Sequence, residues 1–353
     1  TIKQANEQRV NETNKQTNTE NHIVYLSLRD KLETGGKPST WLPPGRFVEL
    51  STHYFRLRLI FNHEVCGANR ISFGMQDLDP EVQRRVNRVQ SFEIFESILT
   101  DRVRDCYEEI AFDLLIGQPG QTVETMSATC DGIIALKPTL VQLSLMAYKP
   151  WVAKYQMRML AEGPLPDFFE RKQLLAVIHE KLGRAGYIRS GFECYSLPGS
   201  PMTKAFEAGE AHYGAAGHQP GGRGNFLAVG SSSMSNLGQD YYFQNFYDIS
   251  TYQKCVAGGQ FAIFRGMKLS DDDKIRQHAT QQIRSYFCLD FDNFKKNYGI
   301  DFETYFSTEM ELLKPLEEDG LVEVQPSRVQ LTEIGRDFVQ SIMNIFDVYD
   351  PPV

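Results

Sequence analysis

The sequence predicts an α/β protein in which a parallel sheet or barrel of alternating strands and helices precedes a small helical, winged-helix-like domain. Two observations carry this prediction. Strand-like and helix-like segments alternate between residues 70 and 186, as they do in barrels and doubly wound sheets. After about residue 265 the pattern changes to amphipathic helices around a hairpin. We therefore expect a polar lead-in and first helix over 1–33, an incomplete barrel over 34–262 and a C-terminal domain over 263–353.

The elements of the expected sheet can be read in chain order. Residues 1–22 are polar and lack aromatic side chains, and we expect a helix to begin in the apolar segment 23–28. Residues 71–75 predict a short strand, and 79–104 a helix with a proline in its first turn. The later predicted elements are a strand at 110–116, apolar on both faces, a helix at 123–134, a strand at 140–146 and a helix at 174–182.

The C-terminal part has the spacing of helix, hairpin and helix. Ser270 and Asp273 predict a capping box, and apolar residues recur every four positions from Ile275 to Phe287. A hairpin follows between residues 321 and 332, and a last apolar helix between 335 and 346. Although winged helices often bind DNA, the local composition is acidic, so we expect no phosphate-binding face.

The composition excludes several classes of protein. The six cysteines are scattered, and the closest two are Cys106 and Cys130, which excludes a disulfide scaffold, a zinc ribbon and a close-spaced iron–sulfur ligand run. The formal net charge of -8 argues against general nucleic-acid binding. No apolar stretch approaches the roughly 20 residues of a membrane span, and no signal peptide is visible. We expect a cytoplasmic protein with reduced thiols.

Most candidate functional residues also have an ordinary structural interpretation. Gly35 and Gly36 are typical of a turn, and Gln76 and Arg88 of exposed polar positions at a strand end and on a helix. Asp113 is different, because a carboxylate inside an apolar strand must be paired, protonated or placed at the strand's carboxyl end. In parallel barrels that end is where ligands bind.

Two further segments leave alternatives open. The small residues 231–233 beside Gly230 fit either close approach of a ligand to the backbone or a tight turn. His212 and His218 flank a glycine-rich loop without acidic or cysteine neighbours at ligand spacing, so we predict no metal site there.

Several longer segments together resemble a known family. They are residues 70–77 with the sequence Arg-Ile-Ser-Phe-Gly-Met-Gln-Asp, 79–90, 113–122, 147–151 and, in the C-terminal part, 264–272 and 319–322. They resemble the oxygen-independent coproporphyrinogen III oxidase (dehydrogenase) family of radical S-adenosylmethionine enzymes, over roughly residues 34–350. The element Val86-Asn87-Arg88 favours the porphyrinogen-processing branch over the haem-chaperone-like branch.

The resemblance implies a radical-SAM type (β/α) barrel and a defined chemistry. In this family a [4Fe-4S] cluster held by three cysteines cleaves S-adenosylmethionine to a radical. The radical starts the decarboxylation of two propionates, which converts coproporphyrinogen III to protoporphyrinogen IX in haem biosynthesis. The implied partner is this tetrapyrrole substrate, without nucleic acid or membrane, and we expect a monomer.

Seven positions match the family's contacts to S-adenosylmethionine: Gly35, Gly36, Gln76, Arg88, Asp113, Ala147 and Met234. The two glycines would lie against the methionine part of the cofactor. Arg88 suits a carboxylate, and Asp113 suits hydroxyl or ammonium donors. Ala147 and Met234 would be apolar or backbone neighbours.

The sequence also departs from the family pattern. The family's three-cysteine motif should precede the Gly35–Gly36 loop, but no cysteine precedes Cys66. The chain also looks shortened between residues 61 and 70. Two interpretations follow, and the sequence leaves both open. Either the cluster ligands precede Thr1, or the chain is a degenerate relative that binds haem or a porphyrin, or a partner, without catalysis.

Overall fold

The computed structural model describes two strands near the N-terminus and most of the chain from residue 67 onward. For the two early strands, β1 (Ile23–Leu28) and β2 (Arg46–Leu50), the backbone alone is described. The remaining described residues are 67–349, except 152–153, 215, 222–224 and 238–239. Gly35 and Gly36 therefore lie outside the described residues.

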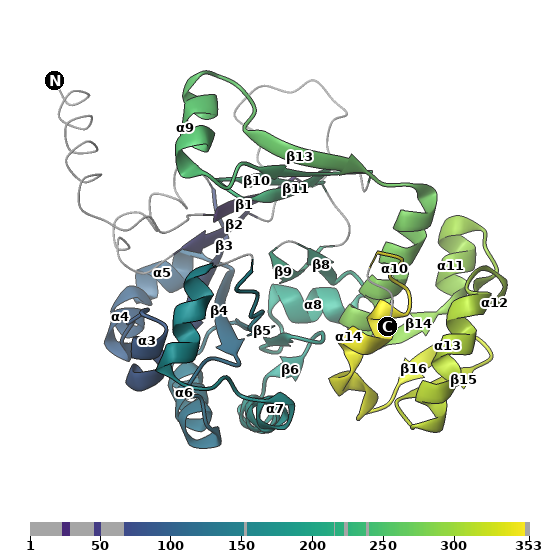
Figure 1. The fold of residues 1–353 in the computed structure, drawn as a ribbon, viewed down its shortest axis with the longest axis horizontal. Coiled ribbons are helices and arrows are strands. Elements are labelled where there is room, and N and C mark those ends of the chain that lie inside the picture. Colours follow the sequence, from purple (N-terminus) through teal and green to yellow (C-terminus); the bar gives the residue numbers. More distant parts are fainter. Residues whose placement is uncertain are drawn as a thin grey trace.

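One mixed sheet of eleven strands organises most of the molecule (Figure 1). Its strand order is β13-β12-β11-β10-β1-β2-β3-β4-β5-β7-β6, and strands β2 to β5 run parallel. Its remaining strands are β3 (Arg70–Gln76), β4 (Glu109–Ile116), β5 (Leu140–Leu145), β6 (Ile188–Arg189), β7 (Cys194–Ser196), β10 (Asn225–Val229), β11 (Met234–Leu237), β12 (Tyr241–Asn245) and β13 (Ile263–Lys268). The two outermost strands, β13 and β6, do not pair with each other, so the described sheet is not a closed barrel.

Helices cover one face of the parallel strands, which is apolar. They are α3 (Pro80–Arg85), α4 (Phe92–Ile98), α5 (Asp101–Cys106), α6 (Val123–Leu136) and α7 (Phe168–Arg184), and a 3-10 helix, η3 (Lys154–Glu162), follows β5. Phe73 and Phe112 on adjacent strands meet edge to face at 5.8 Å, and Phe95 of α4 meets Phe112 at 5.6 Å. All three rings are buried, so this face forms the main core.

Two predicted elements differ in the structure. Residues 23–28 form a strand rather than a helix; Ile, Val and Tyr favour an extended chain, and this strand pairs with both β2 and β10. The predicted helix over 79–104 is three short helices. Each of the three begins at its own N-cap residue, Asp79, Ser91 or Thr100, because these short polar side chains favour non-helical backbone. The strands predicted at 71–75, 110–116 and 140–146 are confirmed as β3, β4 and β5.

A hairpin lies over the other face of the sheet. After α8 (Pro201–Glu207), strands β8 (His212–Gly214) and β9 (Gly217–Gln219) pair with each other only. Ala216 at the hairpin turn packs on Phe226 and Ala228 of β10. The chain then returns to the large sheet through β10 to β13, with α9 (Ile249–Ala257) between β12 and β13.

The C-terminal elements gather at one side of the molecule (Figure 1). They are α10 (Asp271–Tyr286), β14 (Cys288–Asp290), α11 (Phe291–Tyr298), α12 (Phe302–Tyr305), α13 (Ser307–Glu318), β15 (Val322–Gln325), β16 (Arg328–Leu331), η4 (Gly335–Asp337) and α14 (Val339–Asn344). The three strands form a separate sheet, and the capping box of Ser270 and Asp273 is present as predicted. None of the helices in the described residues is long and apolar enough to cross a bilayer.

Candidate cofactor site

The face of the sheet that turns away from the main core is polar. Along β3, Arg70, Ser72 and Gly74 alternate with the core residues Ile71 and Phe73. On β4 the pairing places Glu109 beside Arg70 and Asp113 beside Gly74. The strand predicted at 110–116 was expected to be apolar on both faces, and this is wrong for the face of β4 that carries Glu109 and Asp113. We call it the inner face, because the β8–β9 hairpin lies over part of it.

Three of the predicted site residues converge at the carboxyl end of β3 and β4. The side chains of Gln76 and Arg88 lie over Gly74. A Cβ atom built at Gly74 would be 2.9 Å from Gln76 Nε2 and 3.0 Å from Arg88 Nη2. Arg88 Nη2 donates to the Gly74 carbonyl at 3.0 Å. Asp113 is the residue opposite Gly74, and its carboxylate accepts from Ser72 Oγ at 2.5 Å. A guanidinium and a carboxylate thus flank a backbone position that lacks a side chain.

Backbone geometry at Gln76 turns the chain sharply at the end of β3. Gln76 has a φ of 66°, an uncommon left-handed conformation for a residue with a side chain. The next residue, Asp77, is buried, and its carboxylate holds the turn. It accepts from the Asp79 backbone N–H at 2.8 Å, from Thr129 Oγ1 at 2.9 Å and from Gln121 Nε2 at 2.7 Å. Burial raises the pKa of the Asp77 carboxyl, an effect these hydrogen bonds partly offset.

Gln121 connects this turn to the loop that follows β4. Its Oε1 accepts from the backbone N–H groups of Gly117 and Gln118 at 2.8 and 3.0 Å, and its Nε2 also donates to the Leu115 carbonyl at 2.8 Å. All four hydrogen-bonding positions of this buried amide are therefore filled. The two loops at the carboxyl ends of β3 and β4 are fixed to each other through one side chain.

A second buried amide positions the segment that carries Arg88. Gln83 Nε2 donates to the carbonyls of Asp77 and Gln90, both at 2.7 Å, and its Oε1 accepts from the Gln90 N–H at 2.9 Å. Arg88 Nε in turn donates to Gln90 Oε1 at 3.3 Å. Within the described residues, the Arg88 guanidinium donates hydrogen bonds only to the Gly74 carbonyl and the Gln90 side chain. Neither of these acceptors is a carboxylate. Arg88 is therefore suited to bind an anionic ligand group.

The structure places Ala147 and Met234 at the same edge of the sheet. Ala147 is exposed just beyond β5, and its carbonyl accepts from Gln156 Nε2 at 3.0 Å. Met234 begins β11 and is 39% exposed. Because β10 runs parallel to β2 and β3 across the intervening β1, the β10–β11 turn lies at their carboxyl edge. The register carried through these strands puts Met234 on the same inner face as Asp113.

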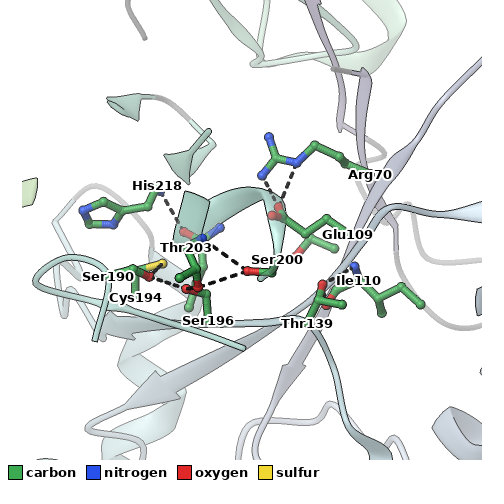
Figure 2. Close-up of polar contacts among 12 residues, drawn as sticks. Arg70, Glu109, Ile110, Thr139, Ser190, Cys194, Ser196, Ser200, Thr203 and His218 are labelled. Atoms are coloured by element: carbon green, nitrogen blue, oxygen red, sulfur yellow. Dashed lines mark hydrogen bonds and ion pairs between the residues drawn. The ribbon is translucent and has the colours of Figure 1, made fainter. Parts of the chain in front are cut away.

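Deeper on the inner face lies a buried polar layer (Figure 2). Arg70 and Glu109 form an ion pair with 6% and 1% side-chain exposure, and Arg70 Nε donates to Glu109 Oε1 at 2.7 Å. Below the hairpin, the buried hydroxyls of Ser190, Ser196 and Thr203 are linked at 2.8 and 2.7 Å. Buried groups of this kind are stable only when paired, so this part of the inner face is structural.

His218 closes the polar layer from the hairpin side. Its backbone N–H donates to Gln142 Oε1 at 3.0 Å, and its ring is fully buried beside Gly191. Burial, and secondly the charge of Arg284, lower the pKa of His218 to about 3, so the ring is neutral. In the described residues, no group of three His, Cys, Asp or Glu side chains could hold a metal. His212 and His218 are therefore not part of such a group.

The described thiols do not fit the three-thiolate ligation of a [4Fe-4S] cluster. Cys106, Cys130, Cys194, Cys255 and Cys288 are all unpaired, and no three of them come together. Burial raises the pKa of Cys130 and of Cys194 to about 12, so both are protonated thiols rather than thiolates. In its described part, the chain therefore presents no set of thiolates that fits the cluster.

Comparison with known proteins identifies the family. The chain is 32% identical over 352 residues to the oxygen-independent coproporphyrinogen III oxidase of Pseudomonas aeruginosa, covering 94% of this chain and 76% of that protein. The chain belongs to the oxygen-independent coproporphyrinogen III oxidase family. The family profile described as HemN C-terminal domain matches residues 269–338. The resemblance inferred from the sequence is thereby confirmed.

Other members of the coproporphyrinogen III oxidase family agree in sequence and in fold. The Helicobacter pylori enzyme is 30% identical over 283 residues, which are 80% of this chain and 62% of that protein. The solved structure of coproporphyrinogen III oxidase (HemN) from Escherichia coli, a radical SAM enzyme, superposes with a TM-score of 0.76 at 29% identity. That match covers 86% of this chain and 69% of the Escherichia coli chain. The chain thus spans less than two thirds of the Helicobacter pylori relative and somewhat more of the other two.

Several residues that build the site were missed in the sequence analysis. Gly74, Ser72, Asp77 and Gln121 were not singled out, although they fix the positions of Gln76, Arg88 and Asp113. One signal was present in the sequence. Polar or small residues alternate with large apolar ones from 70 to 76, which is typical of a strand with one face in a site. The roles of the seven predicted contact residues themselves stay predictions.

Proposed function

We propose that this chain binds S-adenosylmethionine at the carboxyl edge of its sheet, as a member of the family that oxidises coproporphyrinogen III without oxygen. One observation carries the proposal. Gln76 and Arg88 converge over Gly74 of β3. Gly74 lies directly opposite Asp113 of the adjacent parallel strand β4. The carboxyl ends of parallel strands are the usual place for ligands in such folds.

Each of the three side chains has a chemical role in this proposal. The Arg88 guanidinium, held by the Gly74 carbonyl and Gln90, would bind the methionine carboxylate through its remaining N–H groups. The Asp113 carboxylate, which accepts from Ser72 Oγ, would also accept from hydroxyl or ammonium groups of the ligand. Gln76 would orient a polar group of the ligand above Gly74. Ala147 and Met234 would line the same edge.

The full reaction, conversion of coproporphyrinogen III to protoporphyrinogen IX, needs more than this site. In the family it depends on a [4Fe-4S] cluster, and the 353 residues contain no closely spaced trio of cysteines. We therefore infer that these residues bind and enclose the reactants, and that activity depends on three thiolates from outside them. Supplied with such thiolates, the chain would act as an oxidoreductase of porphyrin biosynthesis.

Calorimetric titration of the 353-residue chain with S-adenosylmethionine tests the proposal. We expect saturable binding that Arg88→Ala weakens about tenfold or more, because a charge-assisted hydrogen bond is lost. Asp113→Asn should weaken binding without altering the fold. Arg84→Ala is the matched control, because Arg84 is an exposed arginine of the preceding helix paired with Glu81. Unchanged binding by both site variants, or no binding at all, would contradict the proposal.

A non-catalytic haem- or porphyrin-binding role is the second candidate. It is favoured by the missing cluster ligands and by a groove of about 660 Å³ between the β8 region and α10 and α11. The groove is lined in part by His212, Tyr286 and Cys288, side-chain types that can ligate haem iron. Haem titration followed by the Soret band tests it. A saturable shift that His212→Ala abolishes would support this role, and no shift would exclude it.

A further inference from the structure

We propose that Arg265 binds a propionate carboxylate of the tetrapyrrole substrate, held in place for this task by Gln244 and Tyr247. This inference rests on the proposed function, because it assigns a substrate contact at the edge of the same site. It concerns strands β11 to β13, which extend the sheet beyond the parallel strands (Figure 1).

The pairing of these strands places Arg265 next to the predicted cofactor edge. Arg265 lies opposite Gln244 in the β12–β13 pair, and Gln244 lies opposite Met234 in the β11–β12 pair. Directly paired residues point to the same face of a sheet. The three side chains therefore form a row on the inner face, at the edge that also carries Asp113 and Gln76.

The Arg265 side chain is exposed yet oriented. Its Nε donates to Gln244 Oε1 at 3.0 Å, and its Nη2 lies 3.5 Å from the Tyr247 hydroxyl. The Tyr247 hydroxyl also donates to Gln244 Oε1 at 3.0 Å, and Gln244 Nε2 donates to the Ser232 carbonyl at 3.0 Å. Because Gln244 is buried and accepts from Nε, the guanidinium is held from that side.

Arg265 differs from several other described arginines in having no carboxylate partner within the described residues. Among the described residues, ion pairs join carboxylates to Arg70, Arg276 and Arg284, but none joins a carboxylate to Arg265. Neutral oxygens position it instead. A guanidinium oriented by an amide, rather than neutralised by an acid, is suited to bind a carboxylate through both Nη groups.

The turn beside this row is strained and braced. Ser232, between β10 and β11, has a φ of 60°, which is uncommon for a residue with a side chain. Its N–H donates to the Phe246 carbonyl at 2.8 Å, and Asn245 Nδ2 donates to the Gly230 carbonyl at 2.9 Å. Strained backbone held by its surroundings is a frequent property of binding sites. Gln244, which donates to the Ser232 carbonyl and accepts from Arg265 Nε, links this turn to the arginine.

The test is a fluorescence titration of the full 353-residue chain with coproporphyrin III, the stable oxidised form of the substrate. We expect Arg265→Ala to weaken binding about tenfold and to reduce its dependence on ionic strength. Arg265→Lys should weaken it about threefold, because lysine keeps the charge without the planar fork. Lys268→Ala is the matched control, because Lys268 is a cation on the opposite face of the same strand.

The possible outcomes separate this inference from the function on which it rests. Binding by the unaltered chain together with equal affinity of Arg265→Ala would overturn the role of Arg265 alone. Loss of S-adenosylmethionine binding in Arg265→Ala, with coproporphyrin binding unchanged, would also overturn it and assign the arginine to the cofactor. No coproporphyrin binding by the unaltered chain would overturn the role of Arg265, whereas the proposed S-adenosylmethionine site is tested separately by the calorimetric titration. The tetramethyl ester of coproporphyrin III, which lacks free carboxylates, should bind equally to the unaltered chain and to Arg265→Ala.

Discussion

Gly74 on β3 lies directly opposite Asp113 on β4, and the space above Gly74 is filled by the ends of Gln76 and Arg88 rather than by a side chain of its own. This relationship defines the candidate site, because it lets a cation and a carboxylate approach the same point. It also explains why residue 74 is a glycine although its φ does not require one.

Gly74→Ala should therefore disturb binding more than stability. The new Cβ would meet Gln76 Nε2 at 2.9 Å and Arg88 Nη2 at 3.0 Å, and both are ends of flexible side chains that can move. We expect a change in unfolding free energy within about 1 kcal/mol and a loss of S-adenosylmethionine affinity of about tenfold. Gly183→Ala in α7 is the control, because a Cβ there meets nothing within 4 Å. Equal affinities for both variants would contradict this account of Gly74.

Gln121→Ala should loosen both loops of the site. The substitution removes four hydrogen bonds and leaves the buried Asp77 carboxylate and two backbone N–H groups without their partner. We expect a destabilisation of about 3 kcal/mol in urea unfolding, together with weaker S-adenosylmethionine binding. Gln118→Ala is the comparison, because its side chain donates one bond, to the Leu115 carbonyl at 3.1 Å. Similar effects of the two variants would show that the link through Gln121 is unimportant.

The buried pair of Arg70 and Glu109 should be sensitive to the loss of one partner. Glu109→Gln removes the countercharge that Glu109 supplies to the buried guanidinium of Arg70. We expect a loss of about 3 kcal/mol or more in unfolding free energy. Replacing both residues with apolar ones of similar volume, as in Arg70→Met with Glu109→Leu, should restore much of this stability. A double variant as unstable as the single one would argue that the charges have a further role.

Acid stability should depend on His218. Burial lowers its pKa from 6.5 to about 3, so the stability that its neutral ring allows is present above pH 6.5 and is lost as the pH falls toward 3. At pH 5 the loss should be about 2 kcal/mol. His218→Phe should flatten this part of the curve of melting temperature against pH. His212→Phe, a partly exposed position on the same hairpin, should leave the curve unchanged, and an unaltered curve in His218→Phe would refute the assignment.

Local patterns were enough to predict the strands of the sheet. The apolar run at 110–116 and the segment at 140–146 match β4 and β5 to within one residue, because buried strands are short and apolar. The presence of Asp113 inside this strand was likewise visible in the sequence, which left open whether its carboxylate is paired, protonated or at the strand's carboxyl end. The helix predicted over 79–104 was less accurate, because three N-cap residues inside it interrupt the helix and outweigh its overall helical spacing.

The network behind the site could not be predicted from local patterns. Asp77 is bound by Gln121 and Thr129, which lie 44 and 52 residues further along the chain. Gln83 and Gln90 look like ordinary surface amides in the sequence, yet both are buried. Their role depends on how three loops meet at the sheet edge. The row of Arg265, Gln244 and Met234 depends in the same way on pairings between strands that no spacing in the sequence defines.

The pairing of β13 with β12 has a practical consequence for dividing this protein into fragments. The predicted boundary at residue 263 coincides with the first residue of β13, which forms the outer strand of the large sheet. A fragment that ends before β13 would leave β12 as an unprotected edge, prone to associate with other chains. A C-terminal fragment beginning at Ser270 would instead start on the N-cap of α10, close to the start of the matched family profile at 269. Expression of the C-terminal domain should therefore begin after Lys268, and the sheet should keep its last strand.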